Sequence, residues 1–162
     1  MTITQLLNDF KESAFRLETL SEYNVPTETK AREYFRTNGT IPEGHNDEWL
    51  RLIKQNVSAG KTMKRLRILT LPLTEYEQFE MAAYKGNIAA GEQIRFLKNK
   101  KLKPIQDFWA FDNKWIARML YDDRGAWLGA EVSEMNEDDQ RIVAAWIKVW
   151  ESAKSINEAV DW

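Results

Sequence analysis

The stretch DFWAFDNKWIARMLYDDRGAWLGAEV, residues 107–132, decides the fold class of this chain. It holds three aromatic-rich runs, Asp107–Phe111, Lys114–Tyr121 and Ala126–Val132, that are typical of β-strands. Between them stand Asp112-Asn113 and Asp122-Asp123-Arg124-Gly125, the residue types that tight hairpin turns prefer. The stretch therefore predicts three consecutive strands in a sheet that is at least partly antiparallel.

Alternation of polar and apolar residues predicts further strands at 14–18, 62–71 and 93–98. Helices are expected over roughly the first ten residues, over 28–36 with Thr27 as its cap, over 47–59, after Pro72, and over 137–153. Thr74 and Glu77 form a capping box for the helix after Pro72. We expect a single α/β (α+β) domain, residues 1–162, with a mixed, partly antiparallel sheet of about six strands and flanking helices.

Composition excludes several classes of function. The 162 residues contain no cysteine, so disulfides, thiolate metal sites and a cysteine nucleophile are excluded. A net charge of −2 argues against generic binding to nucleic acid or to an anionic membrane. The N-terminus lacks the layout of a signal peptide, and no apolar run approaches the roughly 20 residues that span a bilayer. We expect a cytoplasmic protein without a membrane partner.

Two familiar motifs are present only in part. Ala59-Gly60-Lys61-Thr62 ends like a phosphate-binding loop, but it leads from a helix into a strand, whereas that loop leads from a strand into a helix. Gly60 is better interpreted as the end of a helix. The only histidine, His45, lies in a polar loop without apolar neighbours, which favours a surface residue over a general base. We expect no catalytic residue, no metal site and no cofactor.

Carboxylates are plentiful around the three hairpin strands. Asp112, Asp122 and Asp123 occupy turn positions, where aspartate accepts hydrogen bonds from its own backbone. Asp107 and Glu131 lie within strands, so a magnesium site is geometrically possible there. Glu80 could join them.

Two runs of basic residues could merge into one phosphate-binding stripe if their strands pair. The alternative is a solvated face or an edge strand protected by lysines, which the acidic net charge favours. The runs are Lys61, Lys64, Arg65 and Arg67, then Lys98, Lys100, Lys101 and Lys103.

A polar and aromatic run lies between the basic clusters. Tyr76, Glu80 and Tyr84 are four residues apart, so a helix places them on one face. Such a stripe is too polar for an ordinary core, and either lines a pocket or is satisfied internally by Arg67 or Arg95. Short connections should bring further polar and aromatic residues close to it. The predicted ligand-binding residues are Tyr76, Glu80, Tyr84, Asn87, Glu92, Arg95, Asp107 and Trp109.

The chain resembles a bacterial family of unknown function that is common in actinobacteria and often encoded near helix-turn-helix regulators. The resemblance rests on Phe15-Arg16-Leu17-Glu18, Pro72-Leu73-Thr74-Glu75-Tyr76, Ala90-Gly91-Glu92, Asp107-Phe108-Trp109 and Gly129-Ala130-Glu131. It implies a fold similar to a degenerate phospholipase D domain. Active members of that class carry His-x-Lys followed by Asp, whereas His45 is followed by Asn46 and Asp47. The resemblance thus implies lost chemistry and a remaining phosphate-sized pocket.

The leading hypothesis is a non-catalytic ligand- or protein-binding domain of a bacterial regulatory system, with a helix-turn-helix regulator as one partner and a small or phosphate-containing ligand. One alternative is a magnesium-dependent hydrolase or nuclease that uses Asp107, Glu131 and Glu80. Another is a toxin–antitoxin or phage-defence component.

Overall fold

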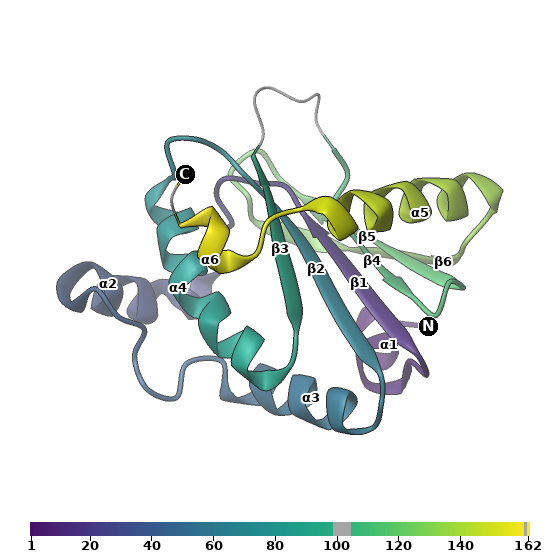
Figure 1. Ribbon diagram of the computed structural model, residues 1–162, viewed down its shortest axis with the longest axis horizontal. Helices are drawn as coiled ribbons and strands as arrows, with labels where there is room; N and C mark the ends of the chain where they lie inside the picture. The colour runs from purple at the N-terminus through teal and green to yellow at the C-terminus, as the bar shows by residue number, and fades with distance from the viewer. Residues whose placement is uncertain (99–104, 161) are drawn as a thin grey trace.

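The computed structural model describes residues 1–98, 105–160 and 162. Within them, six strands form one sheet in the order β3-β2-β1-β4-β5-β6 (Figure 1). The strands are β1 (Ser13–Glu18), β2 (Thr62–Leu69), β3 (Gln93–Lys98), β4 (Phe108–Phe111), β5 (Trp115–Tyr121) and β6 (Trp127–Glu134). The helices are α1 (Ile3–Asp9), α2 (Thr29–Asn38), α3 (Asp47–Ser58), α4 (Glu75–Ala90), α5 (Glu137–Ser152) and the short α6 (Ile156–Ala159), which the sequence pattern did not predict.

Parallel and antiparallel pairing divide the sheet into two halves. β1 pairs in parallel with β2, and β2 in parallel with β3, because helices connect these strands. β4, β5 and β6 are antiparallel neighbours joined by tight turns, and β4 attaches them to β1. The mixed sheet with hairpins at 107–132 is therefore confirmed.

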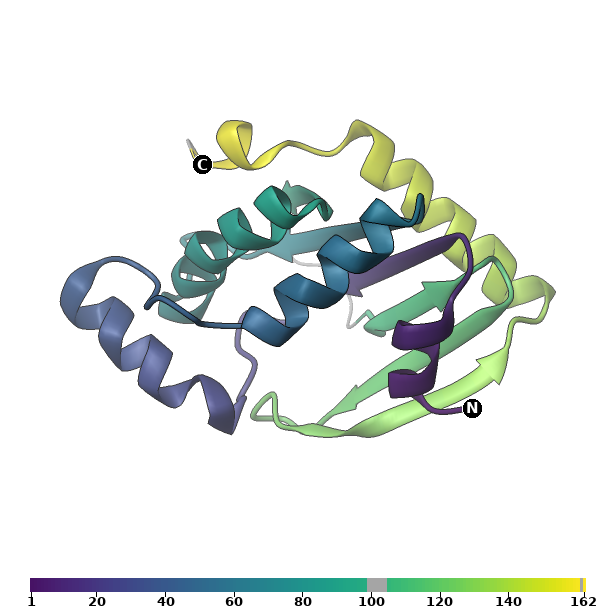
Figure 2. The same ribbon diagram turned by 90° about the horizontal axis from the view of Figure 1, so that it is seen from below.

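Helices cover both faces of the sheet. Apolar side chains of α1 and α3 pack on one face against Ala14, Met63 and Phe111. α5 packs on the opposite face, where Val143 and Trp150 meet Phe15, Leu17, Leu66 and Ile68 of β1 and β2. Figure 2 shows α5 and α1 on opposite sides of the strands. α4 lies beside α3, so the two parallel crossovers share the face that carries the site.

Local signals explain most helix ends. Thr74 accepts a hydrogen bond from the Glu77 N–H, and the Glu77 carboxylate accepts one from the Thr74 N–H, so the predicted capping box is confirmed. Gly60 follows α3 with a φ of 85°, as predicted for a residue that ends a helix. The prediction of Thr27 as a cap is wrong. Residues 26–28 form a 3-10 turn, which places Thr27 inside the turn, and α2 begins at Thr29.

The chain beyond α5 covers the β3 edge of the sheet. Lys154 pairs with Phe96 through two backbone hydrogen bonds, and Ala159 of α6 packs against the same region. Lys100, Lys101 and Lys103 of the second basic run lie outside the described residues. Among the helices of the described residues, none combines the length and the apolar character that a membrane span requires.

Candidate functional site

Charged side chains line the sheet face beneath α4. Alternation along β1 places Arg16 and Glu18 on this face, and alternation along β2 does the same for Arg65 and Arg67. The parallel register sets Arg16 beside Arg65 and Glu18 beside Arg67, and all four side chains are buried. With three further buried carboxylates they make up what we call the buried charge network: Arg16, Glu18, Arg65, Arg67, Glu80, Glu92 and Asp107.

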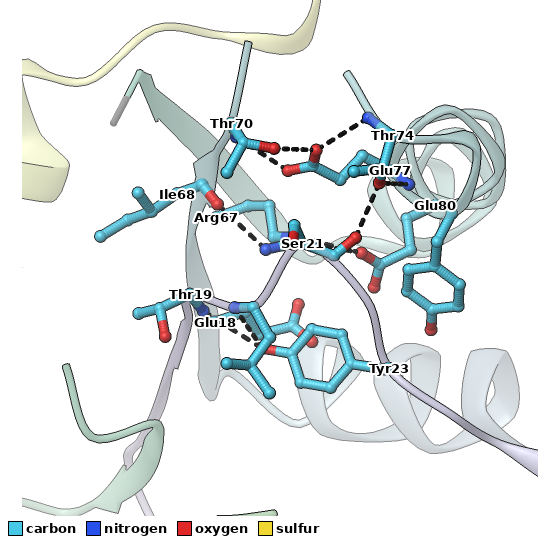
Figure 3. Close-up of polar contacts among 12 residues, drawn as sticks. Glu18, Thr19, Ser21, Tyr23, Arg67, Ile68, Thr70, Thr74, Glu77 and Glu80 are labelled. Carbon is cyan, nitrogen blue, oxygen red and sulfur yellow. Dashed lines mark hydrogen bonds and ion pairs between the residues drawn. The ribbon is translucent and has the colours of Figure 1, made fainter. Parts of the chain in front are cut away.

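Arg67 ties β2 to α4. Its side chain is 0% exposed, and its Nε and Nη2 donate to Glu80 Oε1 at 3.0 and 2.6 Å. Its remaining terminal nitrogen, Nη1, donates to the carbonyl of Ile68 at 3.0 Å. Figure 3 shows Arg67 and Glu80 together, with Tyr23 close to them. A buried guanidinium needs such partners because desolvation of an unpaired charge is costly.

Arg65 connects two carboxylates from different elements. Its Nε donates to Glu92 Oε1 and its Nη1 donates to Glu18 Oε1, both at 2.6 Å. Asn87 at the end of α4 donates to the other oxygen of the Glu92 carboxylate, with its Nδ2 3.0 Å from Oε2. The pair of contacts from one guanidinium fixes the positions of both carboxylates.

The hydroxyl of Tyr84 lies between the carboxyl groups of Glu18 and Glu80. It is 2.6 Å from Glu18 Oε1 and 3.1 Å from Glu80 Oε2. A phenol carries one proton, so when that proton is given to Glu18 over the shorter contact, Tyr84 and Glu80 share a hydrogen bond only while Glu80 is protonated. Burial raises the pKa of Glu80 to about 7, against the effect of Arg67, which agrees with this arrangement.

The pKa of Glu18 is shifted in the opposite direction. Burial alone would raise its pKa, but Arg65, together with Arg16 and Arg67, lowers it to about 2. Of the two carboxyl groups that share one tyrosine, Glu18 is therefore ionised near neutral pH while Glu80 titrates there.

Asp107 holds the opposite end of the network. It accepts hydrogen bonds from the Thr19 N–H at 3.0 Å, from the Thr19 hydroxyl at 2.6 Å and from the Tyr23 hydroxyl. Arg16 Nη2 lies 3.6 Å from its Oδ2 and donates to Tyr121 at 2.9 Å. Burial raises the pKa of Asp107, and Arg16 opposes this effect.

A cavity of about 400 Å³ opens above the network. We call it the α4 cavity, because α4 supplies Tyr76, Glu80, Tyr84 and Asn87 to its wall. Glu18 and Arg65 form part of its floor, while Trp49 and Trp127 contribute indole rings. A concave site with a few convergent polar groups and aromatic walls has the ordinary form of a small-molecule site.

Residues 1–160 match a protein family that is described as a domain of unknown function, DUF6879. The chain belongs to this family. No curated protein matches the chain.

The structure of this DUF6879 chain brings seven of the eight predicted site residues together. Tyr76, Glu80, Tyr84 and Asn87 line the α4 cavity, and Glu92 and Asp107 belong to the charge network beneath it. The ring of Trp109 lies 5.9 Å from Arg16 and 5.7 Å from Arg65, measured to their guanidinium carbons.

The prediction that Arg95 lies beside these residues is wrong. Arg95 alternates with Ile94 and Phe96, which pack toward α4, so its own side chain points toward α5. There its Nη1 donates to the carbonyls of Trp150 and Glu151, and it stacks on the Trp150 ring at 4.0 Å. Glu80 therefore pairs with Arg67, which was the other internal partner that the sequence offered.

The predicted site residues did not include the four charged residues of β1 and β2, although the sequence offered Arg67 as an internal partner of the stripe. β2 does pair with β3, but Arg65 and Arg67 are buried in ion pairs and cannot form a phosphate-binding stripe. They are not a solvated face either. Lys64 alternates with them and lies 4.5 Å from the Trp150 ring on the opposite face.

His45 is less exposed than expected for a surface loop of the DUF6879 chain. Its ring packs edge-on against Phe79 of α4 with 5.6 Å between ring centres, and partial burial lowers its pKa. The loop after α2 folds back onto α4, which supplies the apolar neighbour that the local sequence lacked. His45 does not line the α4 cavity.

Metal binding gains no geometric support. Among the described residues, no group of three histidine, aspartate or glutamate side chains could hold an ion. Glu131 is exposed on β6, opposite Arg118, and does not converge with Asp107 and Glu80. Asp122 accepts hydrogen bonds from the N–H groups of Arg124 and Ala126, which confirms its turn chemistry. For Asp112 the prediction is wrong, because its carboxylate accepts from the N–H groups of Glu12 and Ser13 at the start of β1 rather than from its own turn.

Proposed function

We propose that this chain is a non-catalytic domain that binds a small ligand in the α4 cavity. The observation that carries the proposal is the cavity floor, where Glu18 and Arg65 are held in fixed positions by buried partners. A preorganised polar floor reduces the cost of ordering side chains when a ligand binds. The aromatic rings around it supply apolar contact area.

The contacts of three carboxylates of the buried charge network support binding rather than catalysis. Glu80 Oε1 is held by two nitrogens of Arg67, and both oxygens of Glu92 have donors. Asp107 is held by Thr19 and Tyr23. A general base needs a lone pair that can reach the proton of a substrate. Most lone pairs of these carboxylates already accept hydrogen bonds within the network.

The wider role that fits such a domain is ligand sensing in a bacterial regulatory system, with a helix-turn-helix regulator as partner. The relationship to degenerate phospholipase D domains and the toxin–antitoxin role stay predictions from the sequence. A sensor needs a ligand that alters the stability of one conformation, so ligand binding is the property to test first.

The test is a thermal-shift screen of small metabolites against wild type, Trp127→Ala and Leu128→Ala. Trp127 lines the cavity and is 55% exposed, so its removal should leave the fold intact. Leu128 is its exposed neighbour outside that cavity, which makes it the matched control. A ligand of the cavity raises the melting temperature of wild type and Leu128→Ala and raises that of Trp127→Ala much less. Equal shifts in all three proteins, or no shift from any compound, would contradict the proposal.

A further inference from the structure

The α4 cavity and the network beneath it carry more negative than positive side chains. Three guanidinium groups, of Arg16, Arg65 and Arg67, face the four carboxylates of the network. Glu28 adds a fifth carboxylate at the cavity wall, where it accepts a hydrogen bond from Tyr76 at 2.8 Å. Arg32 lies over the Tyr76 ring and pairs with Glu22, and its charge also acts on Glu28. When Glu80 is ionised, the five carboxylates therefore outnumber the three guanidinium groups of the network by two.

Carboxylate oxygens at the cavity also lack hydrogen-bond donors. Glu80 is 7% exposed, and its Oε2 has only the Tyr84 hydroxyl, whose proton is already given to Glu18. Glu18 Oε2 has no hydrogen bond in the described part of the chain, and Arg16 Nη2 lies 3.9 Å from it. Carboxylate oxygens of largely buried residues normally find a donor. Here the cavity is the open side from which a donor can approach.

Aromatic rings surround the same space. Trp49, Tyr76, Tyr84, Tyr121 and Trp127 all line the cavity. The faces of such rings attract cations, with tryptophan the strongest. Tyr84 already shows this property, because the guanidinium of Arg65 lies 5.5 Å from the centre of its ring.

We propose that the α4 cavity takes a small organic cation that carries N–H donors, such as a primary amine or a guanidinium compound. This inference rests on the proposed function, and it names the ligand class of the same site. The cation would donate to Glu80 Oε2 and Glu18 Oε2 and stack against the indole rings. An anion such as phosphate would meet Glu18, Glu28 and Glu80, while Arg65 and Arg67 already donate to carboxylates and Arg16 does not line the cavity.

Binding of such a cation is linked to the proton on Glu80. The charged groups around Glu80 are Arg67 of β2 and Glu18 of β1, with the hydroxyls of Tyr84 and Tyr76 from α4 itself. A ligand that donates to Oε2 favours the ionised carboxylate and releases its proton. With a pKa of about 7 in the free protein, affinity should rise about tenfold between pH 6 and pH 8.

The experiment measures quenching of tryptophan fluorescence and calorimetric heats with agmatine and butylamine. Butanol, butyrate and inorganic phosphate serve as the neutral and anionic probes. We expect the two cations to bind wild type, with an affinity that rises toward pH 8, and the other probes to bind much more weakly. In Glu80→Gln, which keeps the shape of the neutral acid, the pH dependence of affinity should disappear.

A second pair of variants separates local charge from net charge. Glu28→Gln keeps an acceptor for Tyr76 and should weaken binding of the cations about two- to fivefold. Glu33→Gln removes the same charge from the exposed face of α2 and should leave the affinity unchanged. Equal effects of the two variants would overturn the assignment of the cation to this cavity.

The remaining outcomes separate this inference from the proposed function. If butyrate or phosphate binds and Trp127→Ala abolishes that binding, the cavity is a ligand site but its ligand is an anion, and the inference fails alone. If butanol binds as well as butylamine, charge plays no part and the inference again fails alone. If neither these probes nor the metabolite screen gives a signal that Trp127→Ala removes, both proposals fail.

Discussion

Replacement of Glu80 by glutamine should make the folded protein insensitive to pH over a range in which the wild type loses stability. Glutamine reproduces the neutral acid: its carbonyl can accept from Arg67 and its amide can donate to Tyr84. The charge network is thereby kept, and only the titration at Glu80 is removed. The variant therefore tests the protonation that the short Tyr84–Glu18 contact implies.

The sign follows from the direction of the shift. The pKa of Glu80 rises from 4.5 to about 7 on folding, so between these values the folded state binds a proton that the unfolded state has lost. The stabilising effect is complete below pH 4.5 and is lost as the pH rises through 7. From pH 5.5 to 8.0 the loss amounts to roughly 2 kcal/mol. Glu18 titrates far below this window, because Arg65 holds its pKa near 2 despite burial.

Urea denaturation at pH 5.5 and 8.0 measures the effect for both proteins. The comparison is the change in unfolding free energy of wild type minus that of Glu80→Gln. Because His45 titrates in both proteins, its contribution to the unfolding free energy cancels in this difference. Burial lowers the pKa of His45, so that contribution changes with pH in the opposite direction to that of Glu80. A variant with the same pH dependence as wild type would refute a protonated Glu80. So would a variant that is several kcal/mol weaker at both pH values, because that result requires an ionised Glu80 throughout.

Three further predictions concern single residues or ions. Glu80→Ala should lower the unfolding free energy by about 3–5 kcal/mol in urea, because it leaves the 0% exposed Arg67 without its carboxylate; a loss below 1 kcal/mol would mean that Arg67 is solvated in solution. His45→Ala should cost about 1 kcal/mol by the same assay, since it removes an aromatic contact with Phe79, and a cost near zero would place His45 in solvent. Millimolar Mg²⁺ or Mn²⁺ should leave the melting temperature unchanged, whereas a site filled at 100 times its dissociation constant would add about 2.7 kcal/mol and several degrees.

Most of the fold could be predicted because its signals are local. Strand alternation, the Thr74–Glu77 capping box and Gly60 each act within a few residues, and all appear where the sequence places them. The short hairpin turns fix the order β4-β5-β6 in the same way. α6 could not be predicted, since four residues hold no helical period and their position depends on packing against β3.

The site was predicted on the helix and missed on the strands. The spacing of Tyr76, Glu80 and Tyr84 fixes their common face whatever covers it. Alternation in β2 likewise shows that Arg65 and Arg67 share a face, but it does not show whether water or a helix covers that face. The covering helix and the partner carboxylates come from distant parts of the chain. A usable signal was Arg16, which stands between the apolar residues Phe15 and Leu17 on β1 and needed a partner of opposite charge.

One half of this sheet face is apolar and the other half is charged, and this contrast gives a reason for the charge network. Beneath α1 and α3 this face is apolar, with Ala14, Met63 and Phe111 buried against the helices. Beneath α4 the next residues along the same strands, Arg16 and Arg65, are charged.

Buried ion pairs often add less stability than well-packed apolar residues of the same volume, because desolvation offsets their attraction. The apolar half shows that this sheet can bury such a face without charges. The charged half is the one that borders the α4 cavity, and it holds the oxygens of Glu18 and Glu80 at that cavity in fixed positions. Stability alone gives no reason for that placement, whereas a requirement to present ordered carboxylates to a ligand does.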